Sequence, residues 1–285
     1  MQQHIEFLNR DHFHQKYYRK KAKPSISKFI DFFWETDFDD LFKQHPNGFS
    51  DLLFPDVGYT YIINLGTPFT MQIDNDAFEL KSDAFIPRYK NITATHSAGN
   101  KLFGIKFKVS PVIFEKKIDF SEYTSYIFPL AYLIDRTIVE KVKLAPSFVK
   151  RMEILSAYYE NLIEKYSRSL KHVDIVTEIL KSSYDNNFYE SIEDLAIHYN
   201  ISTKTLQRYF ENTTSISTKP ALQIMRIRKS VSAYVQAPDT FDPAAFGYFD
   251  YSHFYKHINQ FLKNHKAANI TSHLQLLQGS GIINY

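Results

Sequence analysis

The sequence predicts an α+β protein whose first half is rich in β-strands and whose second half is helical. Residues 58–66 and 101–109 are β-branched and aromatic runs bounded by glycine or other turn residues, a composition typical of strands. Beyond residue 119, apolar residues instead recur at helical spacing. We therefore expect a β-rich domain over residues 1–168, formed by a sheet or small barrel with helices. An all-α domain over 169–270 and a tail over 271–285 should follow.

Composition excludes several classes of protein. The chain of 285 residues is long enough for two domains of ordinary size. It has no cysteine, which rules out disulfides, thiolate metal sites and cysteine nucleophiles. No apolar run approaches the ~18 residues of a transmembrane helix, and the polar N-terminus does not fit a signal peptide. We expect a cytoplasmic protein that does not bind membranes.

The N-terminal residues suggest a short helix behind a polar lead-in. Residues 1–23 are polar and end in a basic run, so we interpret them as a flexible lead-in, with a nucleic-acid arm as the alternative. Ile26, Phe29, Ile30 and Phe33 recur at helical spacing. We expect a short helix here that ends at Trp34.

The strand predicted over residues 101–109 alternates cleanly between two faces. Its bulky apolar residues point one way, while Gly104, Lys106 and Lys108 point the other. We expect the two lysines to face solvent, with a barrel interior as the alternative.

A long helix is predicted in the region that follows. Its apolar stripe repeats by three and four residues and comprises Phe148, Met152, Leu155, Tyr159, Leu162 and Tyr166. The stripe is explained either by packing within the chain or by a dimer seam. The polar stretch 165–172 marks the expected domain boundary, and another amphipathic helix should cover 173–183.

Residues 191–210, which we call the first unit, have the pattern of a helix-turn-helix. Ser191 and Asp194 have the spacing of a capping box at the start of a short helix. A turn at 199–200 precedes Ser202, which is suited to cap a second helix. On that helix Leu206 and Phe210 should point inward. The outer face should carry Thr203, Lys204, Gln207 and Arg208.

Residues 242–262, the second unit, repeat the same plan. Asp242 should cap a short helix that begins with Pro243, Gly247 permits the turn, and Asp250 caps the next helix. Inward positions are predicted for Phe254, Ile258 and Phe261. The outer face should carry Tyr251, Ser252, Tyr255, Lys256 and Asn259.

The segment between the two units is helical by spacing. Residues 220–235 would span ~24 Å at ~1.5 Å per residue. With the flanking turns added, the outer helices of the two units would lie ~34 Å apart. That separation is one turn of B-DNA, so both helices could enter successive major grooves. Arg226, Arg228 and Lys229 on this linker would contact either phosphates or the first domain.

Basic residues are concentrated in the same region. Residues 200–266 contain nine Lys and Arg against four Asp and Glu, a net charge of +5, whereas residues 1–199 have a net charge of −2. Nucleic-acid binding requires such an asymmetry, although a solvated surface produces it too. Arg and Gln on an outer helix also suit the major-groove edges of guanine and adenine.

These residues carry a family resemblance. Residues 173–262 resemble the DNA-binding domain of AraC/XylS-type transcription regulators, through IEDLAIHYNISTKTLQRYF, Arg226-Ile227-Arg228 and AFGYFDYSHFYKHINQF. FIDFFW, FPDVGYTYIINLGTPF and the run from 86 to 111 resemble a sensor domain of such regulators. The resemblance implies binding of double-stranded DNA and contact with RNA polymerase. A possible small-molecule effector is suggested instead by the β-rich pattern of the first domain and its many Phe and Tyr residues, and a possible homodimer by the apolar stripe of residues 148–166. The resemblance also implies DNA contacts from Lys204, Gln207, Arg208, Ser252, Tyr255 and Lys256.

The chain departs from the family pattern at several positions. Thr214 stands where the family usually has Gly before the linker helix, and Ser217-Thr218 stand where it has Ser-Pro. Ile258-Asn259 replace Phe-Lys, and residues 263–269 lack the usual Gly and Ser-Pro. These departures predict a second unit that holds DNA more loosely than the first.

Two other classes of function compete with this interpretation. A cupin-like metalloenzyme needs histidines and a carboxylate converging inside a barrel, and the candidates are His12, His14, His45 and His96. No ligand motif surrounds them, and the sequence has neither a Gly-x-Ser-x-Gly elbow nor a phosphate-binding glycine loop. We therefore expect no cofactor, no metal and no catalytic residues. The other alternative is a protein-interaction module that has lost DNA binding.

Overall fold

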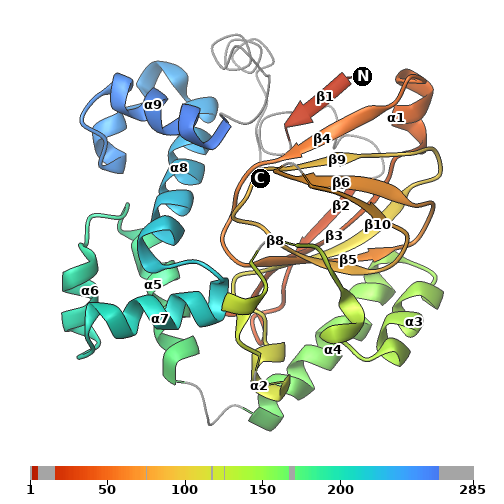
Figure 1. Ribbon diagram of the computed structural model, residues 1–285, viewed down its shortest axis with the longest axis horizontal. Coiled ribbons are helices and arrows are strands. Elements are labelled where there is room, and N and C mark those ends of the chain that lie inside the picture. Colours follow the sequence, from red (N-terminus) through yellow and green to blue (C-terminus); the bar gives the residue numbers. More distant parts are fainter. Residues whose placement is uncertain are drawn as a thin grey trace.

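The computed structural model describes residues 2–5, 17–74, 76–116, 118–124, 126–166 and 171–262. Two parts are evident in Figure 1. The β-rich part extends to residue 166 and contains two facing sheets, with helices outside them. The helical part, residues 171–262, lies to one side of the sheets. The predicted α+β class is therefore confirmed.

The β-rich part is built from two sheets whose neighbouring strands are antiparallel, apart from the parallel β1–β4 pair. The five-stranded sheet has the order β1 (Gln2–Ile5), β4 (Phe49–Leu53), β9 (Ile92–Thr95), β6 (Phe69–Ile73) and β7 (Asp76–Leu80). The six-stranded sheet has the order β11 (Phe128–Pro129), β8 (Ala84–Pro87), β5 (Tyr59–Asn64), β10 (Lys101–Phe107), β3 (Ile30–Asp37) and β2 (Tyr17–Lys21).

Both faces of β10 are buried. Phe103, Ile105 and Phe107 belong to the core on the outer side of the six-stranded sheet, as predicted. The opposite face looks into the space between the sheets, where Gly104 leaves room for Trp34: a Cβ at Gly104 would lie 2.0 Å from the indole. Lys106 is only 3% exposed, so its predicted solvent position is wrong. Its ammonium group instead contacts Asp56 and donates to Val57 O. Lys108 is exposed, as predicted.

The helix predicted to end at Trp34 does not form. A single turn closes when the amides of Phe29 and Ile30 donate to Ile26 O at 3.0 and 2.9 Å, and the chain then extends into β3. An irregularity in the β3–β10 pairing places Phe107 opposite Ile30 while Ile105 pairs with Phe33. The extra residue puts Ile30 and Phe33 on the same buried face, which mimics helical spacing. The basic end of the predicted lead-in is also ordered, because residues 17–21 form edge strand β2.

Helices cover the outer face of the six-stranded sheet (Figure 1). The predicted stripe lies on α4 (Phe148–Tyr166), where Met152, Leu155, Tyr159 and Leu162 are buried in the same core as β10. The stripe is therefore used for packing within the chain. The remaining short elements of this part are α1 (Asp39–Gln44), α2 (Val112–Lys116), η2 (Phe120–Glu122), η3 (Leu130–Tyr132) and α3 (Arg136–Leu144).

The helical part contains the predicted paired units. Its elements are α5 (Lys171–Asp185), α6 (Ile192–His198), α7 (Thr203–Thr214), α8 (Thr218–Gln236), η4 (Pro238–Thr240), η5 (Pro243–Phe246) and α9 (Tyr251–Leu262). In Figure 1 the linker helix α8 runs between α7 at one end and α9 at the other. Among the described residues, no helix combines the length and apolarity needed to cross a bilayer.

One hydrophobic core runs through both parts. It joins the outer face of the six-stranded sheet and α4 to α5, α6, α7 and the start of α8. A second cluster joins Leu52 and Phe54 to α8 and α9. The predicted boundary at residue 168 falls in 167–170, outside the described residues, as do the predicted tail and residues 263–269.

Candidate nucleic-acid interface

The first unit is a well-capped helix-turn-helix. Ser191 and Asp194 form the predicted capping box, with the Asp194 amide donating to Ser191 Oγ at 3.0 Å. The turn contains Asn200 in the left-handed region, at φ 52°. Ser202 then caps α7 by accepting from the Thr205 amide at 3.1 Å. These local hydrogen bonds fix where α7 begins and which of its faces turns outward.

The outer face of α7 carries the four predicted side chains. Leu206 and Phe210 are fully buried, which turns the opposite side of the helix to solvent. There the structure places Thr203, Lys204, Gln207 and Arg208, all exposed. The Gln207 amide donates to Glu211 Oε1 at 2.9 Å, so this side chain must exchange a partner before it can hydrogen-bond a base.

The second unit uses a shorter first helix. Asp242 caps η5 through the Ala244 amide at 2.9 Å, and Pro243 stands at its first position. Gly247 adopts φ 72°, the left-handed conformation that glycine favours. Asp250 caps α9 by accepting from the His253 amide at 2.7 Å. The predicted capping and turn residues are confirmed.

The outer face of α9 brings together most of its predicted side chains. Tyr251, Ser252, Lys256 and Asn259 are exposed. Tyr255 is half-buried instead, and its hydroxyl donates to Tyr234 on α8 at 3.1 Å. Phe254 and Ile258 are buried as predicted; the Phe261 side chain lies outside the described residues.

A polar group lies inside the second unit. The hydroxyl of buried Tyr248 is 2.7 Å from His257 Nδ1 and accepts from Ser230 Oγ on α8 at 3.5 Å. Burial, with the nearby charges of Arg226 and His253, lowers the pKa of His257 to about 4. The imidazole is therefore neutral at pH 7, and its Nδ1 shares a hydrogen bond with the Tyr248 hydroxyl. Sequence analysis missed this pair because nothing local distinguishes a buried tyrosine from a surface one.

The linker helix directs much of its basic charge toward the protein. The Arg226 guanidinium lies 4.9 Å from the ring centroid of Tyr248, and Lys229 donates to Tyr184 O. Arg228 donates to Phe54 O and Pro55 O at 3.2 and 3.1 Å. Of the two alternatives for Arg228, contact with the first domain is the one observed. The charge available to a polyanion is accordingly smaller than the sequence count.

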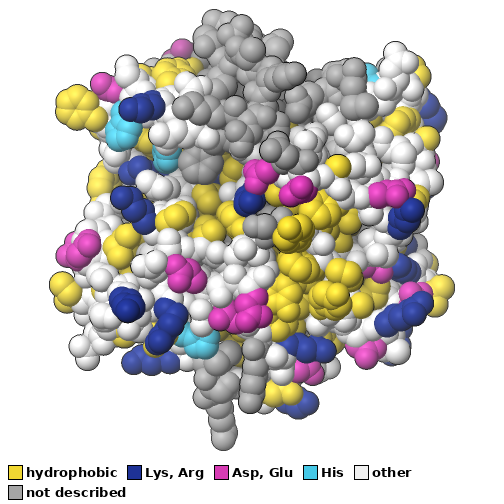
Figure 2. All heavy atoms as spheres, in the orientation of Figure 1, with side chains coloured by type: hydrophobic (Ala, Val, Ile, Leu, Met, Phe, Trp, Pro, Cys, Tyr) yellow, Lys and Arg dark blue, Asp and Glu magenta, His cyan; other side chains and the backbone are white. Residues whose placement is uncertain are grey.

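Other basic side chains remain at the surface. Figure 2 shows Lys and Arg on the helical part both near α6 and α7 and near α9. By their exposed fractions, the basic side chains at the surface of the helical part include Lys204, Arg208, Lys219 and Lys256.

A charged cluster joins the β-rich part to the linker helix. Asp56 lies 3.3 Å from Lys106 Nζ and 3.6 Å from Arg228 Nε. Arg88 donates to Phe54 O at 3.2 Å, the same carbonyl oxygen that accepts from Arg228. Burial would raise the pKa of Asp56, but the charges of Arg228, Lys106 and Arg88 prevail and lower it to about 2. Burial lowers the pKa of Lys106 to about 8, with Asp56 opposing the shift.

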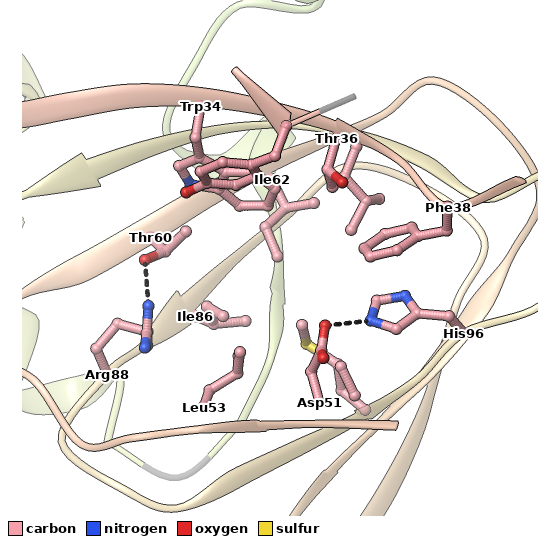
Figure 3. A pocket seen from close by; sticks show the side chains of 14 residues that line it. Trp34, Thr36, Phe38, Asp51, Leu53, Thr60, Ile62, Ile86, Arg88 and His96 are labelled. Atoms are coloured by element: carbon pink, nitrogen blue, oxygen red, sulfur yellow. Dashed lines mark hydrogen bonds and ion pairs between the residues drawn. The ribbon is translucent and has the colours of Figure 1, made fainter. Parts of the chain in front are cut away.

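A cavity of about 60 Å³ lies between the two sheets (Figure 3). Its walls are largely apolar, with Trp34, Phe38 and Ile62 among them, while Arg88 and the Asp51–His96 pair lie on opposite sides. The volume suits a few water molecules. A drug-sized ligand, which occupies ~300–1,000 Å³, would need the walls to move.

The histidines considered for a metal site are arranged otherwise. His96 places Nε2 3.0 Å from Asp51 Oδ2 and Nδ1 2.8 Å from Asn100 Oδ1, so protein side chains occupy both ring nitrogens. His45 lies at the C-cap of α1. His12 and His14 are outside the described residues. Within the described ranges, no group of three or more His, Asp or Glu is placed to hold a metal ion.

Comparisons with known proteins give matches in structure alone. No protein-family model matches the sequence, and no curated protein matches it significantly. The structure of ToxT from Vibrio cholerae is 11% identical, with a TM-score of 0.44, over 93% of this chain and 98% of that chain. An unsaturated fatty acid-bound ToxT is 8% identical, with a TM-score of 0.42, over 86% and 90% of the two chains.

The AraC-like transcriptional activator CuxR is 9% identical, with a TM-score of 0.27, over 79% of this chain and 89% of that chain.

Proposed function

We propose that this chain is a sequence-specific DNA-binding transcription regulator of the AraC/XylS type, in which α7 and α9 enter successive major grooves. One observation supports the proposal above all. Two capped helix-turn-helix units lie at opposite ends of α8, a single 19-residue helix, and the polar faces of their outer helices are exposed. At ~1.5 Å per residue, α8 is about 28 Å long, which suits a separation of one turn of DNA.

The first unit is proposed to read bases directly. Arg208 and Gln207 carry the side chains that pair bidentately with guanine and adenine in the major groove. Lys204 is one turn before Arg208 and is available to phosphate or base. In the second unit, Ser252 and Lys256 are proposed as the main contacts. The two tyrosines are weaker candidates because their hydroxyls are already engaged: Tyr251 donates to Phe241 O and Tyr255 donates to Tyr234.

The β-rich part is proposed to be a regulatory domain whose cavity walls move apart to bind a small-molecule effector. Its support is the cavity between the sheets and the Phe54 carbonyl, which connects cavity-lining Arg88 to Arg228 on the linker helix. Contact with RNA polymerase belongs to the proposal by family resemblance, and a homodimer is proposed beside it. A metabolite screen for compounds that raise the Tm of the full chain tests the effector. Compounds that act through the cavity should lose their effect in Ala94→Leu, which fills it.

DNA binding is tested by selecting bound duplexes from a random-sequence library and measuring Kd on the preferred duplex. Arg208→Ala should cost about 1–3 kcal/mol of binding free energy there and relax the preference at one base pair. Arg136→Ala, an exposed arginine in the β-rich part, is the control and should bind normally. Affinity should fall steeply with salt as phosphate counterions are released.

Two results would contradict this account. If Arg208→Ala lowers the affinity equally for all DNA sequences, Arg208 contacts a phosphate and does not read a base. Failure of the wild-type chain to retain any duplex at low salt would rule out DNA binding.

A further inference from the structure

Phe249 is the most exposed of the large hydrophobic side chains that the structure describes. It is 91% exposed and stands directly before Asp250, the N-cap of α9. Its neighbour Tyr248 is only 3% exposed. Because its side chain is almost fully exposed to solvent, Phe249 contributes no hydrophobic stabilisation to the fold. We therefore looked for a role outside the folded chain.

A comparison of the two turns identifies Phe249 as an extra residue. In the first unit, Asn200 has positive φ and a single residue, Ile201, separates it from the cap Ser202. In the second unit, Gly247 has positive φ and two residues separate it from the cap Asp250. Ile201 and Tyr248 each pack toward the protein. Phe249 is therefore the additional residue of the second turn, and it is the one turned outward.

The turn is held so that Phe249 stays outside. Tyr248 is anchored through its hydroxyl to His257 at 2.7 Å. The Phe249 amide donates to His253 Nδ1 at 3.3 Å, and the Asp250 cap fixes the next residue. With the residues on both sides fixed, the phenyl ring is displayed at the N-terminal end of α9.

We propose that Phe249 makes an apolar contact with the 5-methyl group of a thymine in the major groove entered by α9. The inference depends on the proposed DNA binding. Residues at the N-terminal end of a recognition helix are those that reach base edges, and the thymine methyl is the apolar group on those edges. Tyr251 and Ser252, in the first turn of α9, are exposed next to it. Phe249 thus gives the second unit a base preference that does not depend on hydrogen bonds.

The test replaces thymines by deoxyuridine, one at a time, in the preferred duplex and measures Kd for the full chain. At one position of the second half-site, loss of the methyl should weaken wild-type binding about fourfold, the value expected for burying one methyl group. Phe249→Ala should weaken binding to the thymine duplex by at least that factor and bind the thymine and deoxyuridine duplexes equally. Phe249→Leu should retain part of the discrimination. Leu144→Ala, which removes an 83% exposed side chain from the β-rich part, should behave as wild type.

The outcomes separate this inference from the proposed function. If Phe249→Ala binds tightly and still discriminates thymine from deoxyuridine, the methyl contact is wrong while DNA binding stands. The same holds if Phe249→Ala leaves Kd unchanged and lowers only transcription, because Phe249 would then face a protein partner. If the wild-type chain binds no duplex, both proposals fail.

Discussion

The two helix-turn-helix units share a plan but differ in what holds them. In the first unit, Leu206 and Phe210 belong to the large core that continues into the β-rich part. In the second unit, Phe254 and Ile258 belong to a smaller cluster with α8, Leu52 and Phe54. We therefore expect the first unit to unfold only together with the main core, and the second unit to open at a lower free-energy cost.

Polar groups sharpen this difference. The second unit encloses the Tyr248–His257 pair. The linker helix α8, on which the second unit packs, is joined to the β-rich part by the ion pair between Arg228 and Asp56. The first unit is tied by Ser215 Oγ, which donates to Phe120 O at 2.6 Å. Changes in charge or pH should thus affect the second unit before the first. The comparison predicts which substitutions act on one unit and spare the other.

The largest expected effect comes from removing one buried ring from each unit. Phe210→Ala and Phe254→Ala each delete a fully buried side chain and should cost about 4 kcal/mol of stability. Phe210→Ala should lower the free energy of global unfolding, whereas Phe254→Ala should open α9 alone. Hydrogen exchange measured by mass spectrometry distinguishes the two. If both variants deprotect the whole chain equally, the second unit is not an independent element.

Asp56→Ala should cost about 3 kcal/mol, because it leaves Arg228, Lys106 and Arg88 without their carboxylate. The protection of backbone amides against hydrogen exchange should decrease more in α8 and α9 than in α7. Adding Arg228→Met removes one of the cations that face Asp56 and should recover part of the loss of stability. A double-mutant cycle on urea unfolding measures this coupling, and additive effects of the two changes would count against the cluster.

Mild acid should loosen the second unit through His257. Its pKa is about 4 in the folded protein and ~6.5 unfolded. Between these pH values His257 is protonated in the unfolded state but neutral in the folded state. The free energy of unfolding that is present above pH ~6.5 therefore decreases as the pH falls toward 4. At pH 5 the loss should be about 2 kcal/mol. Exchange in α9 should rise relative to α7, and His257→Gln should abolish that dependence. Unchanged exchange in α9 at pH 5 would contradict the neutral histidine.

The smallest predicted effect concerns the caps. Ser202→Ala and Asp250→Ala each remove a side-chain acceptor at the start of an outer helix and should cost about 1 kcal/mol. The Ser202→Ala cost should appear in the thermal unfolding of the whole chain, and the Asp250→Ala cost mainly as local exchange in α9. Asp250→Asn keeps an acceptor and should be nearly neutral. If Asp250→Ala lowered the Tm of the whole chain more than Ser202→Ala does, the second unit would not be the more independent of the two.

Features set by neighbours in the sequence were predictable. Ser191, Ser202, Asp242 and Asp250 cap the elements that they were predicted to cap, because capping is a local backbone interaction. The inward positions of Leu206 and Phe210 follow equally from helical spacing.

Features set by distant segments were not predictable. Lys106 occupies an alternating position typical of a surface residue, but it is buried and contacts Asp56 and Val57, about 50 positions earlier in the chain. Ile30 and Phe33 fit a helix because a pairing irregularity between β3 and β10 brings them to one face. For Arg228 the sequence could not choose between DNA and protein, since its partners lie at residues 54–56.

Methylation interference on the selected duplex tests the central claim most directly, because methyl groups at guanine N7 lie in the major groove. The account predicts two clusters of interference about 10 base pairs apart on one face of the duplex, with Arg208→Ala weakening one and Phe254→Ala abolishing the other. A single cluster that survives Phe254→Ala, or two clusters on opposite faces, would contradict it.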